Sequence, residues 1–298
     1  MKLPNRRHAG FDETRHYAYP THLRASVDEL PQAPGVYTFH GQDGDLPLYI
    51  GKSVNLRARV LSHLRNPDEA RLLRQTTRIS HQRTAGDIGA LLLEARLVKQ
   101  QHPLMNQKLR RSRQLCAIRL TDVGRPEVVY ARDLDFASEQ GLYGLYGSRH
   151  AAIEALHALA DAHRLCLTVL GLERTSGKRG CFRSMLNRCA GACCGQETEV
   201  AHHARLLAAL QDLQLVCWPF GGAVALVERF DGQPAGLSDM TQWHVVRNWC
   251  YLGSADSLTN ARRLDRLDTG FDGDGYKILC KPLTAVAAGV PGVEVVRL

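Results

Sequence analysis

Residues 34–64 read PGVYTFHGQDGDLPLYIGKSVNLRARVLSHL, and this stretch decides how the first part of the chain folds. Val36–Phe39 and Leu46–Ile50 are short runs of residues that favour β-strands. Residues 41–45 lie between them and contain Gly and Asp, which suit the positive-φ positions of a turn. Apolar residues then recur at helical spacing across 56–64. The stretch therefore predicts an antiparallel hairpin followed by a helix.

The composition is that of an ordinary globular protein. The chain has 298 residues, of which 44% are hydrophobic and 23% charged, and this length allows two or three compact units. The first twenty residues lack the continuous apolar segment of a signal peptide. No apolar run reaches the roughly 18 residues that would span a bilayer. A cytoplasmic location and no membrane partner are therefore the default expectations.

The net charge of +8 is concentrated in one part of the chain. Between Lys52 and Arg113 there are 14 Lys and Arg against 4 acidic residues, whereas the rest of the chain has 24 basic and 26 acidic residues. Such a basic stretch suits a polyanion, because neutralising phosphates releases counterions. A solvated cationic face or a membrane-surface patch is the alternative from charge alone.

Glu94 stands out within the clearest predicted helix, DIGALLLEARLVKQQ at residues 87–101. The spacing places Glu94 on or beside an apolar stripe that includes Leu91 and Val98. A carboxylate in such a place needs a partner, because burying an unpaired charge is costly. Either a metal ion or an arginine would satisfy this carboxylate.

The whole pattern predicts an α+β protein with several units. We expect a lead-in, a domain built on the hairpin, a connector with short strands, a cysteine-rich helical segment and a β-rich C-terminal domain, at residues 1–30, 31–110, 111–150, 151–215 and 216–298. A third strand is predicted at 79–84. Helices are expected at 151–165 and about 197–215, and strands in the segments 217–230, 242–255 and 275–283.

Five side chains near the hairpin have the chemistry that phosphodiester hydrolysis requires. Tyr37, Tyr49 and Lys52 could position or deprotonate a water molecule. Arg59 could hold a phosphate through two hydrogen bonds, and Glu94 could bind a divalent cation. Each residue taken singly also has a structural explanation, since tyrosines pack in strands and basic residues cover surfaces.

Nine cysteines are also present, and five of them fall between Cys166 and Cys194. In a reducing compartment, such a group indicates metal or redox chemistry more than structural disulfides.

The motifs as a group resemble the GIY-YIG nuclease domain, and more narrowly the N-terminal half of UvrC. The matching elements are Gly35-Val36-Tyr37, Tyr49-Ile50-Gly51-Lys52, Arg59, Glu94 within LLLEARLVK, and Asn106 within HPLMNQKL. The order and spacing of these five elements are much more specific than any one of them. The first motif has Val36 where the family name has isoleucine, which is a conservative exchange.

This resemblance implies a role for each matching residue. Tyr49 would act as general base, assisted by Tyr37 and Lys52. Arg59 would stabilise the phosphorane-like transition state, and Glu94 would bind one Mg²⁺ or Mn²⁺.

Two further positions are implied by the same resemblance. Asn106 would brace the site. His63 stands where UvrC-type sequences often have a tyrosine, so its imidazole is a weaker candidate for sharing the proton transfer.

The resemblance continues into the cysteine segment. Cys166, Cys181, Cys189 and Cys193 follow the order of the UvrC-type segment, with 14, 7 and 3 intervening residues. Four thiolates could hold a 4Fe–4S cluster or a Zn²⁺ ion, and the absence of paired Cys-x-x-Cys motifs favours iron–sulfur. Cys194 is an adjacent thiol that could substitute for Cys193. The alternative is a group of buried free cysteines.

Basic residues interleave with these cysteines. They would moderate the charge of the centre or contact DNA phosphates, and they are Arg174, Lys178, Arg179, Arg183 and Arg188.

The chain resembles the short members of the UvrC family, since it has no room for a second nuclease domain or for tandem helix-hairpin-helix modules. This resemblance implies a single incision on the 3′ side of a lesion in double-stranded DNA, after UvrA and UvrB have located the damage. Two other functions stay open. One is a non-catalytic DNA-binding or redox protein built on the cysteines, and the other is a stand-alone, sequence-specific GIY-YIG nuclease.

Overall fold

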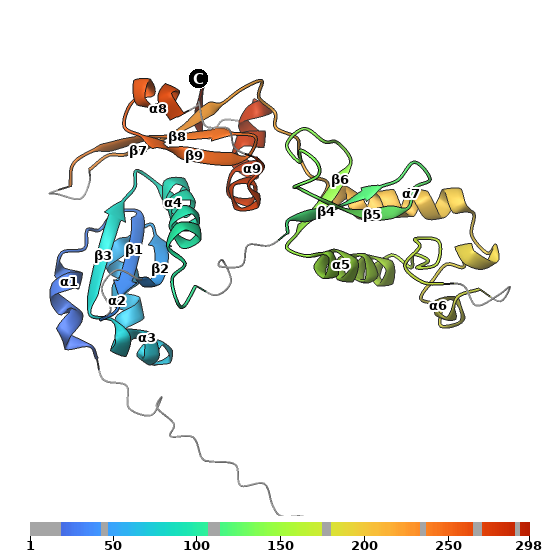
Figure 1. The fold of residues 1–298 in the computed structure, drawn as a ribbon, viewed down its shortest axis with the longest axis horizontal. Coiled ribbons are helices and arrows are strands. Elements are labelled where there is room, and N and C mark those ends of the chain that lie inside the picture. The colour runs from blue at the N-terminus through green and yellow to red at the C-terminus, as the bar shows by residue number, and fades with distance from the viewer. Residues whose placement is uncertain are drawn as a thin grey trace, which may run out of the picture.

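Three small antiparallel sheets, each with its own helices, make up the protein (Figure 1). The computed structural model describes residues 19–42, 47–106, 114–174, 180–232, 237–264, 270–289 and 293–298. The predicted turn residues Gly44 and Asp45 and the basic run 110–113 lie outside the described residues. Within those ranges, no helix is both long and apolar enough to cross a membrane. The predicted α+β class is confirmed.

The first sheet contains the predicted hairpin. Its strands, in the order β2-β1-β3, are β1 (Gly35–His40), β2 (Pro47–Ser53) and β3 (Arg78–Arg83). The surrounding elements are η2 (Thr21–Leu23), α1 (Arg24–Asp28), α2 (Leu56–Leu64), η3 (Pro67–Glu69), α3 (Ala70–Gln75) and α4 (Asp87–Gln101). The predicted helix after the hairpin is α2, and it starts where the Asn55 side chain accepts a hydrogen bond from the Ala58 N–H at 3.0 Å.

Helix α4 is buried from two sides, which differs from the single stripe that the sequence predicts. Val98 packs with Ile50 of β2 on one side, and Leu92 joins the core around Leu279 of the C-terminal domain on the other. Leu91, expected in the buried stripe, is only partly buried. The predicted stripe therefore describes only part of the buried surface, because periodicity cannot reveal that a second domain covers another face of the helix.

The second sheet belongs to the middle of the chain. Its strands, in the order β5-β4-β6, are β4 (Cys116–Leu120), β5 (Pro126–Tyr130) and β6 (Leu142–Tyr146). The accompanying elements are α5 (Arg149–Ala162), α6 (Phe182–Met185), η4 (Ala192–Cys194), α7 (Glu199–Leu210) and η5 (Gln211–Leu213). Ala152 and Leu156 of α5 pack on Cys116 and Ile118 of β4. The strands of the connector thus share a core with the helix of the cysteine segment.

The third sheet forms the C-terminal domain. Its strands, in the order β10-β7-β8-β9, are β7 (Val224–Phe230), β8 (Met240–Arg247), β9 (Cys250–Ala255) and β10 (Glu294–Arg297), and its helices are α8 (Leu258–Leu264) and α9 (Gly273–Ala287). The strand predicted at 275–283 was wrong, because this segment is part of α9. Asp272 caps this helix through its side chain, and Tyr276, Leu279 and Leu283 recur at helical spacing on its buried face.

Candidate active site and cysteine cluster

Tyr37 and Tyr49 lie on neighbouring strands of the first sheet, with ring centroids 6.3 Å apart. Tyr37 is opposite Gly51 in the register of β1 and β2. A Cβ atom on Gly51 would lie only 2.4 Å from the Tyr37 hydroxyl. The glycine of the second motif is therefore required because the ring of Tyr37 lies across it.

A chain of hydrogen bonds leads from Tyr37 into the protein. The Tyr37 hydroxyl and Nε2 of His63 are 2.6 Å apart, and Nδ1 of His63 bonds the carboxylate of Glu69. Only 4% of the His63 side chain is exposed. His63, the weaker candidate from the sequence, thus lies at the centre of the site.

Glu69 was not singled out from the sequence. Glu69 is the last residue of η3, the short helix that follows α2. The turn between the two helices brings its carboxylate back to His63. One signal was available, since Glu69 is one of only four acidic residues between Lys52 and Arg113.

Burial controls the protonation of these groups. It raises the pKa of Tyr37 far above the usual value, and burial together with the Glu94 charge raises the pKa of Tyr49. Burial also lowers the pKa of His63, outweighing the opposing hydrogen bond with Glu69. At neutral pH the site therefore holds two protonated phenols and a neutral imidazole. A neutral His63 that bonds a carboxylate through Nδ1 has Nε2 free to accept the Tyr37 O–H.

Arg59 projects from α2 beside this cluster. Its side chain is exposed, and a hydrogen bond with Tyr37 raises its pKa, so the guanidinium is charged at every working pH. An exposed cation bonded to an active-site hydroxyl suits an incoming phosphate.

Glu94 lies across the site on α4. Its Oε1 accepts the backbone N–H of Lys52 at 3.2 Å, and among the described residues we find no hydrogen bond to its Oε2. Burial raises the pKa of Glu94, which the Lys52 hydrogen bond opposes. The Lys52 ammonium instead bonds Asp87 at 2.7 Å. A half-buried carboxylate with a free oxygen fits a hard divalent cation.

Asn106 braces the strand that carries Tyr49. Its Oδ1 accepts the N–H of Ile50 at 2.9 Å, and its Nδ2 donates to the Ile50 carbonyl at 2.8 Å. Both backbone groups point away from β1. Since β2 is an edge strand of its sheet, no further strand of the described residues is there to pair with them. The side chain thus completes the hydrogen bonds of the residue between Tyr49 and Gly51.

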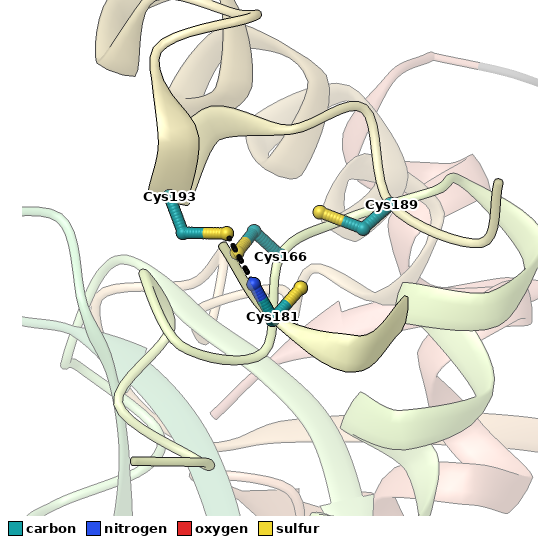
Figure 2. A group of neighbouring side chains, drawn as sticks. All are labelled: Cys166, Cys181, Cys189 and Cys193. Carbon is teal, nitrogen blue, oxygen red and sulfur yellow. Dashed lines mark hydrogen bonds between the residues drawn. The ribbon is translucent and has the colours of Figure 1, made fainter. Parts of the chain in front are cut away.

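The four predicted cysteines converge in the middle of the chain, and Figure 2 shows their side chains pointing toward a common centre. Their sulfur atoms all lie within 4.8 Å of one another, and the residues are Cys166, Cys181, Cys189 and Cys193. Cys194 is outside this group, with its thiol bonded to the Gly191 carbonyl at 3.3 Å.

The pKa shifts of three of the thiols, Cys166, Cys189 and Cys193, show how strongly burial disfavours their charged forms. Burial raises the pKa of Cys189 and of Cys193 to about 12. For Cys166 burial acts in the same direction, but hydrogen bonds from Val169 and Cys193 outweigh it and lower the pKa. Four sulfurs this close can all ionise only around a cation, so the donor set fits a metal centre.

The surroundings of the cluster are partly polar. Nε2 of the buried His202 accepts the Cys166 N–H at 2.9 Å. Arg183 pairs with Asp161 at 2.6 Å, and Arg174 and Arg188 are exposed. The predicted residues Lys178 and Arg179 lie outside the described part of the chain.

Three family models match the chain, one for each sheet. They are the UvrC-like GIY-YIG domain over residues 33–107, the UvrC/Cho excinuclease middle domain over 115–212 and the excinuclease Cho C-terminal domain over 223–298. A solved structure of the GIY-YIG N-terminal endonuclease domain of UvrC from Thermotoga maritima, bound to its catalytic magnesium, is 29% identical. It covers 28% of this chain and 93% of that chain, with a TM-score of 0.26.

Curated relatives match over a greater length. Excinuclease Cho of Escherichia coli strain K12 is 55% identical over 273 residues, which are 92% of this chain and 90% of that protein. The Salmonella typhi protein of the same name is 56% identical over the same shares. The UvrABC system protein C of Bartonella henselae is 32% identical over 57% of this chain and 26% of that protein. The chain therefore belongs to the excinuclease Cho family, and it is a nuclease of DNA repair.

Proposed function

We propose that this nuclease makes a single incision on the 3′ side of a lesion in double-stranded DNA, after UvrA and UvrB have located the damage. The observation that supports it most is the hydrogen-bonded chain Tyr37–His63–Glu69 facing Arg59 and Glu94. One nuclease domain is among the three family models that match, which agrees with one cut. The basic stretch that begins at Lys52 would attract the DNA backbone.

The hydrogen bonds suggest a path for the proton of the attacking water. Tyr49 would take this proton while passing its own to Tyr37, whose ring lies on the neighbouring strand with its centroid 6.3 Å away. Tyr37 would in turn pass its proton to Nε2 of His63. The resulting imidazolium would be stabilised by Glu69. No free phenolate is required, which matters because burial raises the pKa of both tyrosines.

Charge stabilisation would come from Arg59 beside the tyrosines and from a cation at Glu94. Arg59 would hold two oxygens of the phosphate through its planar guanidinium. A divalent cation at Glu94, Mg²⁺ or Mn²⁺, would supply Lewis-acid stabilisation of the charge that develops on the phosphate. Asn106 would keep Tyr49 in place by fixing the backbone of Ile50.

The cysteine cluster would hold a structural metal centre in the middle domain. The spacing of Cys166, Cys181, Cys189 and Cys193 favours a 4Fe–4S cluster. Zinc is the second candidate. One tetrahedral Zn²⁺ ion would hold its four sulfur ligands about 3.8 Å from one another. The sulfurs lie within 4.8 Å of one another, which is compatible with such an ion.

Incision mapping on a duplex with one defined bulky lesion tests the proposed function. With UvrA, UvrB and Mg²⁺ we expect one nick on the 3′ side, and nicking slower by at least about 100-fold when Arg59→Ala or Glu94→Ala replaces the native chain. Cutting of undamaged DNA at a fixed sequence without UvrA and UvrB would instead indicate a stand-alone nuclease. DNA binding with full retention of fold but no nick would indicate a non-catalytic protein.

A further inference from the structure

Helix α4, which carries Glu94, begins without a capping side chain of its own. Its N-cap is Gly86. Glu228 of β7, in the C-terminal domain, caps the helix instead. Its Oε1 accepts the Ile88 N–H at 3.0 Å and its Oε2 accepts the Gly89 N–H at 2.6 Å. The first N–H groups of a helix lack intrahelical partners and carry partial positive charge, so a carboxylate is a favourable cap.

Glu228 is itself held in place. Its Oε2 lies 2.9 Å from Nε2 of His244, a residue with no exposed side-chain surface. Nδ1 of His244 lies 2.6 Å from the Ser254 hydroxyl. Burial raises the pKa of Glu228, but the hydrogen bonds from His244 and Gly89 outweigh it and leave the pKa lowered. The cap is therefore an ionised and well-oriented carboxylate.

Two glycines make room for this contact. A Cβ on Gly86 would lie 2.2 Å from Oε1 of Glu228, and a Cβ on Gly89 would lie 2.6 Å from Cε1 of His244. Glycine inside a helix costs about 1 kcal/mol relative to alanine. Glycine at position 89 is unfavourable for the helix itself. It is required there because His244 of the C-terminal domain leaves no room for a side chain.

The same domain also holds the other end of α4. The Lys99 ammonium pairs with Asp272 at 2.6 Å and Asp274 at 2.8 Å, both at the start of α9. Glu94 lies between these two attachments. Figure 1 shows α4 between the first sheet and the C-terminal domain.

We propose that the C-terminal domain positions Glu94 for metal binding by holding α4 at both ends, with Glu228 as the main positioning residue. Ile88 and Glu94 are about 9 Å apart along the helix axis, so a shift at the first turn moves the carboxylate with it. The proposal rests on the proposed role of Glu94 as a metal ligand. Groups that hydrogen-bond a metal ligand directly change metal affinity by about 10- to 100-fold when they are removed, and Glu228 acts through the helix, so we expect the lower end of that range.

Direct Mn²⁺ binding to the full chain, measured by calorimetry or by electron paramagnetic resonance, tests the proposal. Glu94→Gln defines the signal that belongs to this site. We expect Glu228→Gln to raise the Kd of that site about tenfold, because the amide cannot accept both N–H groups. Nicking by this variant should have a lower kcat at low Mn²⁺, recover at high Mn²⁺ and keep the KM for DNA. Glu294→Gln is the matched control, since Glu294 pairs with the exposed Arg229 in the same sheet.

Gly89→Ala provides an independent test that leaves every charge in place. Alanine has the higher helix propensity, so intrinsic helix stability alone predicts unchanged or tighter Mn²⁺ binding. The proposal predicts weaker binding, because the methyl group would displace His244 and Glu228.

The outcomes separate the two hypotheses. A lower melting temperature with unchanged Mn²⁺ affinity in Glu228→Gln and Gly89→Ala would show a purely structural contact and overturn the proposal. Glu94-dependent Mn²⁺ binding that weakens in Glu228→Gln and Gly89→Ala, in a chain that never nicks lesion-bearing DNA, would overturn the proposed function while supporting the positioning role.

Discussion

The Tyr37 hydroxyl lies 2.6 Å from Nε2 of His63, although 26 positions separate the two residues in the chain. This buried contact joins β1 to α2, and in the proposed proton path it makes the imidazole, not bulk water, the acceptor after the tyrosines. The carboxylate of Glu69 on the far side of the ring completes the arrangement. Other hydrolases also place a hydroxyl, an imidazole and a carboxylate in a row, with the imidazole taking the proton of the hydroxyl and the carboxylate orienting the imidazole.

His63→Ala should lower kcat for nicking by about 10²- to 10⁴-fold, the usual contribution of a general base. The fold should be retained, as checked by circular dichroism, and the KM for DNA should change little. An unchanged kcat would remove His63 from the proton path.

Glu69→Gln should move the acid limb of the pH–rate profile to lower pH. The neutral form of His63 is needed as acceptor, and burial already places its pKa below the usual 6.5. Glu69 raises that pKa, so its loss lowers the pKa further and activity persists to lower pH, with a smaller kcat at the plateau. A shift toward higher pH in single-turnover rates would contradict the arrangement.

Gly51→Ala should abolish nicking and destabilise the protein by about 1–3 kcal/mol, because the added methyl group would lie 2.4 Å from the Tyr37 hydroxyl. Gly221→Ala is the control, since a Cβ there meets no atom of the described residues within 4 Å. Thermal unfolding of both variants measures the difference. Equal stabilities would mean that the Tyr37 ring can move aside at no cost.

Arg59→Lys should recover little of the activity that Arg59→Ala loses. A lysine retains the charge but cannot hold two phosphate oxygens with one planar group. We expect both variants to lose about 10²- to 10³-fold in kcat, the usual effect of removing one donor that stabilises a transition state. Full rescue by lysine would mean that Arg59 supplies charge alone.

Anaerobically purified protein should be coloured and contain iron and sulfide. Cys166→Ser should lose both, because it removes one of the four sulfur ligands. Cys194→Ser should keep both, since this residue lies outside the group of four. A colourless protein with one zinc per chain would replace the iron–sulfur assignment.

Several features of the fold and of the candidate site follow from the sequence alone. The hairpin, the helix after it and the helix at 87–101 are encoded locally, by turn residues, by the Asn55 cap and by apolar periodicity. The order of tyrosines, Arg59, Glu94 and Asn106 also indicates a nuclease domain before any coordinates are known. These signals act over a few residues or as an ordered motif, so they can be read along the chain.

Other features depend on contacts between distant segments, and only the tertiary structure decided them. Glu69 joins the site because η3 turns back to His63, and Glu228 reaches α4 from 139 residues away. The segment 275–283 forms a helix because Asp272 caps it and the core around Leu279 buries it. The spacing of Tyr276, Leu279 and Leu283 also fits a helix, but Pro282 inside the segment disfavours one locally, so the cap and the buried core had to outweigh it.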